Sequence, residues 1–204
     1  MNAPVVTLFE AYGAGADVVG PALAEQLGVP WIGQATTSEQ YEAADAKGTG
    51  RINVRQFLTS LAFLDQGSVE LVQDPMEELA RDQAQQVRGL VASGGVILGR
   101  NATVILTGLP GALHVKLDGP REYRVARAAQ AAGITEEQAA LRQQREDAAR
   151  AEISLEVWGW DPRLTAWYDL VINTATFGLA AAGEMIVDAL NRKRVAAGLQ
   201  PVAG

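Results

Sequence analysis

Short apolar runs alternate with amphipathic helical patterns along this chain, and this alternation limits its fold more than any other feature. Apolar strands are indicated at VVTLF (5–9), VILGR (96–100), ALHVKL (112–117) and YDLVINT (168–174). Helical patterns stand between them, and no hairpin turn joins neighbouring strands. Strands separated by helices form a mainly parallel sheet with helices on both faces, so the sequence predicts an α/β fold.

Caps and stops mark the expected helices. In the first helix, Ala16–Leu27, apolar residues recur at helical spacing and Gly28 supplies a stop. Further helices are predicted over 38–46, 54–64, 75–92 and 178–194, after Gly119-Pro120, and from Thr135 to a break at WGWDP (158–162). Residues 33–75 are polar and weakly patterned, which indicates a lobe inserted into a single domain that spans 1–204.

Composition and charge exclude several function classes. The chain has 204 residues, 48% of them hydrophobic, and no cysteine, so it can bury a core without disulfides and holds no cysteine–zinc site. A net charge of −7 argues against general nucleic-acid binding, so an anionic ligand must be held by a local group of arginines. The N-terminus has no signal-peptide pattern and no apolar run suits a membrane span, so we expect a cytoplasmic protein without membrane contact.

Two features that could suggest a metal site do not support one. The single histidine, His114, lies in the apolar run ALHVKL, where a hydrogen-bonded core histidine is more common than a ligand. The segment DAKGTGRINVRQF (45–57) has the glycine and isoleucine of a calcium loop, but its ligand positions hold Asp45, Lys47, Thr49 and Gln56. These side chains lack the carboxylates that calcium requires. We therefore expect no metal, and a glycine-rich turn at this segment.

The stretch EAYGAGADVVG (10–20) joins the first strand to the first helix, as phosphate-binding loops do. The phosphate-loop pattern G-x-x-x-x-G-K-[ST] nevertheless fails, because its defined positions hold Ala11, Ala16, Asp17 and Val18. Asp17 stands where a lysine belongs, and two like charges about 4 Å apart repel by about 4 kcal/mol at an effective dielectric of about 20. Alternatively, Asp17 caps the helix, so that the protein supplies its own anion. The dinucleotide fingerprint G-x-G-x-x-G also fails at Val18.

Several segments, in order, resemble the cytidylate kinase-like family, whose members are related to nucleoside monophosphate kinases. The resemblance covers roughly residues 5–31 and 80–192. It rests on the loop with Tyr12, Gly13 and Gly15, on LAEQLGVP (23–30), on the helix from Gln83 to Val91 before VILGRNA, on EYRVAR (122–127), on Asp147 with Arg150, and on WGWDP before YDLVINT.

The resemblance implies a P-loop kinase-like three-layer fold, a helical lid over about 135–162, and ATP with Mg²⁺ as cofactor. It implies that the loop Gly13, Ala14, Gly15 and Ala16, next to Asp17, cradles the β-phosphate. It further assigns phosphate contacts to Arg100, Arg124 and Arg127, with Arg142 and Arg145 as additions to the lid. Asp147 and Arg150 are then its catalytic residues. Two departures lie at the ATP end: Phe9-Glu10 replaces Ser-Arg, and Asp17-Val18 replaces Arg-Glu.

Two functions remain open from the sequence. One is an active kinase that moves the γ-phosphoryl group of ATP to a nucleoside monophosphate such as CMP. The other is a kinase-like protein with weak or lost phosphotransfer, which binds a nucleotide, another anion, a protein partner or a second copy as a regulator or scaffold; the acidic ATP end favours this one. Each arginine also has a structural interpretation as an ion pair. Trp158, Trp160 and Trp167 are interpreted as packing or interface residues rather than as a platform on which a base stacks.

Overall fold

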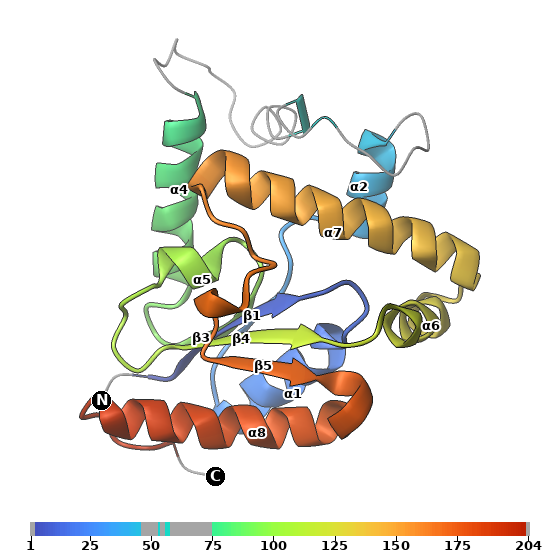
Figure 1. Cartoon of the computed structure of the whole chain (residues 1–204). Coiled ribbons are helices and arrows are strands. Elements are labelled where there is room, and N and C mark those ends of the chain that lie inside the picture. The colour runs from blue at the N-terminus through green and yellow to red at the C-terminus, as the bar shows by residue number, and fades with distance from the viewer. Residues whose placement is uncertain (1–2, 46–52, 54–55, 58–74, 203–204) are drawn as a thin grey trace.

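The computed structural model describes residues 3–45, 53, 56–57 and 75–202. Its centre is a five-stranded sheet in the order β2-β3-β1-β4-β5, and every neighbouring pair of strands is parallel (Figure 1). The strands are β1 (Val5–Glu10), β2 (Trp31–Ile32), β3 (Gly95–Leu98), β4 (Leu113–Asp118) and β5 (Leu170–Asn173). The predicted α/β fold with a parallel sheet is confirmed.

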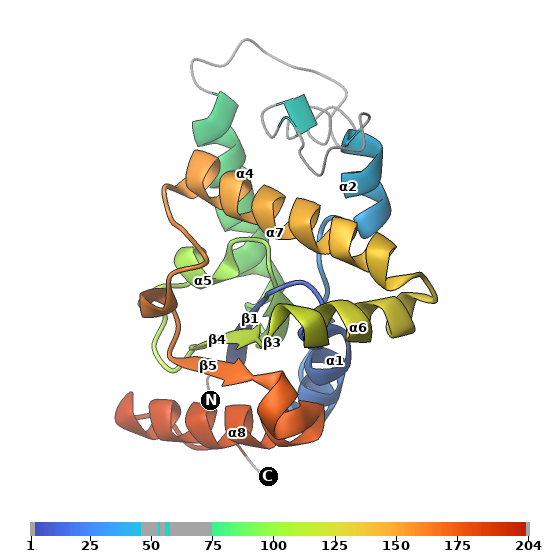
Figure 2. The same cartoon turned by 45° about the vertical axis from the view of Figure 1, so that its right-hand side comes forward.

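Helices cover both faces of this sheet, as Figures 1 and 2 show from two sides. One face carries α1 (Ala16–Leu27) and α8 (Thr174–Ala196), and the other carries α4 (Pro75–Leu90), α5 (Ala102–Ile105) and α7 (Glu136–Trp158). At the carboxyl edge, α6 (Arg121–Ala132) follows β4, and α2 (Ser38–Ala44) packs beside α7. A single 3₁₀ turn (Thr165–Trp167) precedes β5.

The two faces of the sheet bury separate apolar clusters. Towards α1 and α8, the most deeply buried large side chains are at most 1% exposed; they include Leu8, Leu23, Leu117, Ile172, Ile186 and Leu190. Towards α4 and α5, a second cluster contains Val5, Val87, Ile97 and Ile105. Burial of one such side chain contributes about 1.5–3 kcal/mol. The core therefore holds the strands in place, and the polar side chains of interest lie at the carboxyl ends of the strands.

His114 is the hydrogen-bonded core histidine that the sequence predicted. Its Nδ1 lies 2.9 Å from Thr7 Oγ1, which in turn lies 3.1 Å from Thr103 Oγ1. Burial lowers the pKa of His114 from 6.5 to about 4, so the imidazole stays neutral near pH 7. Among the residues that the structure describes, no group of three or more histidine or acidic side chains is placed to hold a metal ion.

Some elements differ from the prediction. The short β2 and α5 were not expected, since two to four residues are too few to carry a periodic pattern. α8 begins at Thr174 rather than Gly178, because Asn173 accepts from the N–H groups of Ala175 and Thr176; Gly178 kinks the helix. The segments 45–57 and 54–64 lie mostly outside the described residues. No helix in the described part of the chain is long and apolar enough to cross a membrane.

Candidate functional site

The glycine-rich loop leaves β1 at Glu10 and enters α1 at Ala16. Gly13 (φ 81°) and Gly15 (φ 106°) have left-handed backbone conformations that favour glycine, so the loop can curl. The curl directs two N–H groups at the Glu10 side chain: the Gly15 nitrogen lies 2.7 Å and the Ala16 nitrogen 3.2 Å from Glu10 Oε1. A helix N-terminus of this kind binds anions. Here the bound anion is a carboxylate of the chain itself.

Glu10 lies in an environment of opposing charges. Burial raises the pKa of its carboxyl above the ordinary value of 4.5, and Asp17 raises it further. The Arg150 guanidinium and the two loop N–H groups act in the opposite direction. Because the net shift is upward, the fold destabilises this anion relative to water, and its charge is easier to remove than that of a surface glutamate.

Asp17 does not have the capping role that the sequence suggested. It lies in the first turn of α1, where a negative charge is favourable. Its carboxylate, however, forms an ion pair with the Arg127 guanidinium from α6, and its side chain is 54% exposed. Within the described residues, no loop N–H donates to it. The protein does supply its own anion to the loop, but from Glu10, because the Asp17 side chain points away towards α6.

Two predicted phosphate-binding arginines, Arg124 and Arg127, and the predicted catalytic Arg150 donate to carbonyl groups at the loop. Arg150 Nη1 lies 3.3 Å from the backbone carbonyl oxygen of Glu10. Arg124 Nη1 lies 2.8 Å from the backbone carbonyl oxygen of Tyr12, and Arg127 Nε lies 2.8 Å from that of Gly13. Several loop N–H groups are bound as well. The Tyr12 N–H donates to Asp147 Oδ1 at 2.8 Å, and the Ala14 N–H donates to the Ala11 carbonyl.

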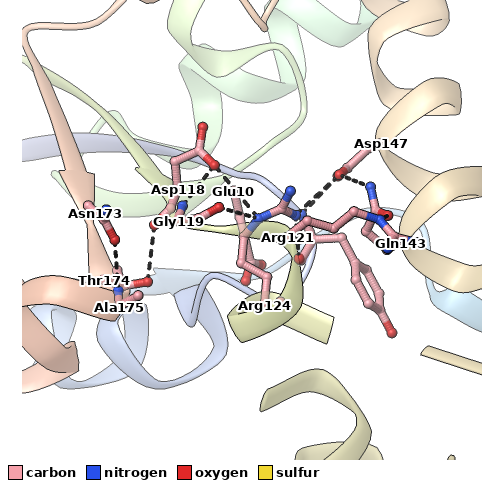
Figure 3. A network of polar contacts seen from close by, with 12 residues as sticks. Glu10, Asp118, Gly119, Arg121, Arg124, Gln143, Asp147, Asn173, Thr174 and Ala175 are labelled. Carbon is pink, nitrogen blue, oxygen red and sulfur yellow. Dashed lines mark hydrogen bonds and ion pairs between the residues drawn. The ribbon is translucent and has the colours of Figure 1, made fainter. Parts of the chain in front are cut away.

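Arg124 is the centre of the network in Figure 3, where it lies between the end of β4 and the helix α7. On the sheet side it donates to the Gly119 carbonyl at 3.0 Å and lies 3.7 Å from Asp118. On the α7 side it is 3.2 Å from Asp147, whose carboxylate also accepts from Gln143. These contacts use the guanidinium on both sides, so Arg124 joins α7 to the loop and the sheet.

Arg150 is buried and has an acidic partner. Its Nη2 lies 2.8 Å from Glu146 Oε2, and both side chains are almost inaccessible. When the Gln34 amide oxygen faces Arg150, it accepts from Nη2 at 2.7 Å and from Nε at 2.9 Å. Arg150 therefore connects α7 with two segments: Glu10 at the end of β1, and Gln34 after β2.

Arg100 differs from the other candidates. Its Nε donates to the Gly33 carbonyl at 3.1 Å, and no ion pair to an acidic side chain is found for it among the described residues. Burial lowers the pKa of this guanidinium below its ordinary value, with no acidic neighbour to oppose the shift. Arg100 is thus a partly desolvated cation at the carboxyl end of β3.

The two further arginines of the expected lid lie elsewhere. Arg142 Nε is 2.9 Å from Glu42, and Arg145 contacts Glu42 at 3.2 Å and Asp45 at 3.6 Å. These pairs hold α7 against α2. Of the tryptophans, Trp160 is 2% exposed and packs edge-on against Trp167 with ring centroids 5.5 Å apart, which agrees with the packing interpretation.

Residues 5–176 match the sequence model of the cytidylate kinase-like family. The chain belongs to this family. The match covers the loop, β3, the helices α6 and α7, and β5, so the resemblance seen in the motifs is confirmed. The kinase-like assignment of the fold is consistent with the observed parallel sheet and its loop after β1.

Individual relatives add to this in different degrees. An uncharacterised protein from Eubacterium ventriosum ATCC 27560, of known crystal structure, has a TM-score of 0.64 at 17% identity over 92% of this chain and 98% of its own, which shows the fold alone. A gluconokinase from Sinorhizobium meliloti 1021 has a TM-score of 0.49 at 18% identity over 94% and 93% of the two chains. A uronate isomerase from Corynebacterium glutamicum is 34% identical over 116 residues, 57% of this chain. Only 22% of that curated relative is covered, so the chain spans less than a quarter of its length.

Most of the residues that the family resemblance selected meet around one loop. Gly13, Ala14, Gly15 and Ala16 form it, and four side chains from α6 and α7 surround it: Arg124, Arg127, Asp147 and Arg150. Arg100 lies at the end of the neighbouring strand β3 and contacts a different segment.

Two residues of this cytidylate kinase-like site were not selected from the sequence. Glu10 was noted only as an acid in place of a family cation. A carboxylate at the last residue of a strand can, however, fold back onto the N–H groups of the glycine loop that follows it. Asn101, the residue after Arg100, carried no recognisable signal, because its importance comes from three partners that are distant in sequence.

Proposed function

We propose that this cytidylate kinase-like protein binds a phosphate-bearing small molecule, such as a nucleoside monophosphate, through Arg100, and that it lacks efficient ATP phosphotransfer. In this role it acts as a regulator or scaffold rather than as a kinase. One observation carries the proposal: the Glu10 carboxylate accepts from the Gly15 and Ala16 N–H groups, at the place where a phosphate loop binds the β-phosphate.

The energetics support the loss of ATP use. Hydrogen bonds to a charged group contribute about 1.5–3 kcal/mol each, and an incoming phosphate must displace two of them. If the carboxylate stays nearby, like charges about 4 Å apart add about 4 kcal/mol of repulsion at an effective dielectric of about 20. The loop of this chain also has no lysine to offset that repulsion, since Asp17 stands at the lysine position.

The electrostatics of Arg100 support anion binding next to the loop. Its guanidinium is partly desolvated and has no acidic partner in the described part of the chain, so an anion gains a charge-assisted contact without breaking an existing ion pair. A guanidinium also suits phosphate through paired N–H donors. Arg124, Arg127 and Arg150, by contrast, each have an acidic partner already.

The second candidate is an active CMP-type kinase, and one observation favours it. Asp147 and Arg150, the D-x-x-R pair of α7, both reach the loop after β1. If ATP with Mg²⁺ displaces Glu10, these two residues would lie next to the bound phosphates, where a kinase needs charged groups.

The test is ligand binding by calorimetry with four probes, ATP–Mg²⁺, ADP, CMP and inorganic phosphate, together with ADP production in the presence of CMP. We expect the wild type to bind CMP or phosphate, to bind ATP–Mg²⁺ weakly or not at all, and to produce no ADP. Glu10→Gln should raise the affinity for ADP about tenfold or more, which corresponds to about 1.4 kcal/mol.

Two control variants separate the loop acid from general charge effects. Asp17→Asn should change ADP affinity less than about threefold, because this carboxylate is exposed and paired. Glu25→Gln, an exposed acid on the far part of α1, should leave affinity unchanged. ADP production by the wild type would overturn the proposal in favour of the active kinase, and CMP or phosphate binding that survives Arg100→Met would overturn the assignment of Arg100.

A further inference from the structure

The end of β3 is strained. Gly99 (φ 67°), Arg100 (φ 54°) and Asn101 (φ 54°) are left-handed in succession, and Arg100 and Asn101 are the two non-glycine residues with positive φ in the described part of the chain. A left-handed conformation is unfavourable for a residue with a side chain, and it persists only where the surroundings enforce it. The question is which contacts enforce it here.

The Asn101 side chain supplies those contacts. It is 9% exposed, and its Oδ1 lies 2.7 Å from Ser154 Oγ and 3.0 Å from Trp160 Nε1. Its Nδ2 donates to Gln83 Oε1 at 2.9 Å, and that oxygen also accepts from Trp158 Nε1 at 2.6 Å. Because an indole N–H can only donate, Trp160 fixes the oxygen end of the amide. The side chain therefore bridges α4, the last turn of α7 and the chain after it.

The same contacts lead to Arg150. Ser154 Oγ lies 2.8 Å from the Arg150 carbonyl, one helical turn earlier in α7, as well as 2.7 Å from Asn101. Arg100 and Arg150 also reach adjacent residues after β2, Gly33 and Gln34 respectively. Two arginines from different elements thus meet one short segment, and Asn101 contacts the elements that carry both.

We propose that Asn101 is a positioning residue that holds the left-handed Arg100 turn against α7, so that Arg100 faces the phosphate-bearing ligand from a fixed place beside the segment that Arg150 also contacts. This inference rests on the proposed function for its ligand. Asn101 does not touch the ligand; it acts through the backbone of Arg100 and through Ser154. A movement of the carboxyl end of α7 then changes the position of the Arg100 guanidinium.

The test compares Asn101→Gly with wild type. Glycine accepts the left-handed backbone without strain but removes every side-chain contact, so the variant isolates the bridge from the backbone conformation. We expect affinity for CMP or inorganic phosphate to fall about tenfold, within the usual range for coupling between sites. Ser154→Ala alone should weaken binding less, and it should have no further effect in the Asn101→Gly background, because the two side chains act through one contact.

A stability control and a ligand-free readout complete the design. Ile186→Val, on the buried face of α8, lowers the melting temperature without touching this network, and it should leave affinity unchanged. Hydrogen exchange over 145–158 should become faster in Asn101→Gly than in Ile186→Val. If the wild type binds CMP or phosphate and Asn101→Gly binds equally well, the positioning role is overturned while the proposed function stands. If the wild type binds neither probe, the proposed function fails. The role of the Asn101 side chain is then tested by hydrogen exchange alone, and it is overturned if exchange over 145–158 is no faster in Asn101→Gly than in Ile186→Val.

Discussion

The loop after β1 and the turn after β3 are neighbours with opposite electrostatic states. They lie at the carboxyl ends of adjacent parallel strands, and the Gly99 N–H donates to the Leu8 carbonyl at 2.9 Å. The loop is closed by groups of the chain itself: Glu10 and Asp147 accept from its N–H groups, and three arginines donate to its carbonyls. The turn instead presents Arg100, a cation with no acidic partner in the described residues.

Under the proposed function, a phosphate-loop shape does not by itself make a phosphate site. The loop has the curl and the helix N-terminus that anions favour, yet two of those donors, the Gly15 and Ala16 N–H groups, already bind Glu10. The turn has no recognised phosphate motif, yet it offers unneutralised positive charge. In a chain of net charge −7, we therefore expect an anion to bind where a local positive charge has no partner.

The largest effect is expected from Arg150→Met, which breaks the loop side of this comparison. Without the guanidinium, Glu146 remains buried without its ion-pair partner, 2.8 Å from the former Nη2 position. Loss of one member of a buried pair destabilises a protein by about 3–5 kcal/mol. Urea denaturation measures this change. Arg81→Met, in an exposed pair with Glu77, is the matched control and should change stability by less than about 0.5 kcal/mol.

Gly13→Ala tests the packing of the loop against α6. A Cβ at Gly13 would collide with the carbonyl of Arg124, in addition to the strain of a left-handed alanine, so we expect a loss of about 2–4 kcal/mol. Gly28→Ala is the control, because Gly28 has a similar φ of 64° but open space around it. The control should lose only about 1 kcal/mol. Equal losses in urea denaturation would show that the loop is not packed against α6.

The pH dependence of stability tests the charge in the loop. Folding raises the pKa of Glu10 above 4.5, so its contribution to stability is complete below pH 4.5 and is lost as pH rises through the raised value. The loss is about 1.4 kcal/mol for each pKa unit. The raised pKa of Glu146 gives a slope of the same sign, so only the difference between wild type and Glu10→Gln isolates Glu10. If the difference in stability between wild type and Glu10→Gln stays constant above pH 4.5, the raised pKa of Glu10 is contradicted.

The smallest effect on stability is expected from Arg100→Met, on the turn side. Removal of Arg100 loses one hydrogen bond to Gly33 but also removes a desolvated cation, so the net change should be within about 1 kcal/mol. The variant should nevertheless abolish CMP or phosphate binding in calorimetry. A loss as large as that of Arg150→Met would mean that Arg100 has a buried anionic partner.

Local patterns predicted much of the fold. Ala16–Leu27 was predicted with its observed bounds, because apolar spacing and Gly28 are both local signals. The strands β1, β3, β4 and β5 were also predicted within a few residues. β2 was not, since Trp31 and Ile32 form a strand only by pairing with β3. Local sequence does not encode a pairing of that kind.

The sequence by itself determined the succession of the longer strands and helices along the chain, the position of the glycine loop and the resemblance to the cytidylate kinase-like family. Only the tertiary structure decided the state of each charge in the site. Asp17 pairs with Arg127, 110 residues away, and Arg150 reaches the Glu10 carbonyl over 140 residues. Periodicity and caps act within one helix or strand, so they can be read locally, whereas ion pairs and loop contacts depend on which elements the packed core brings together.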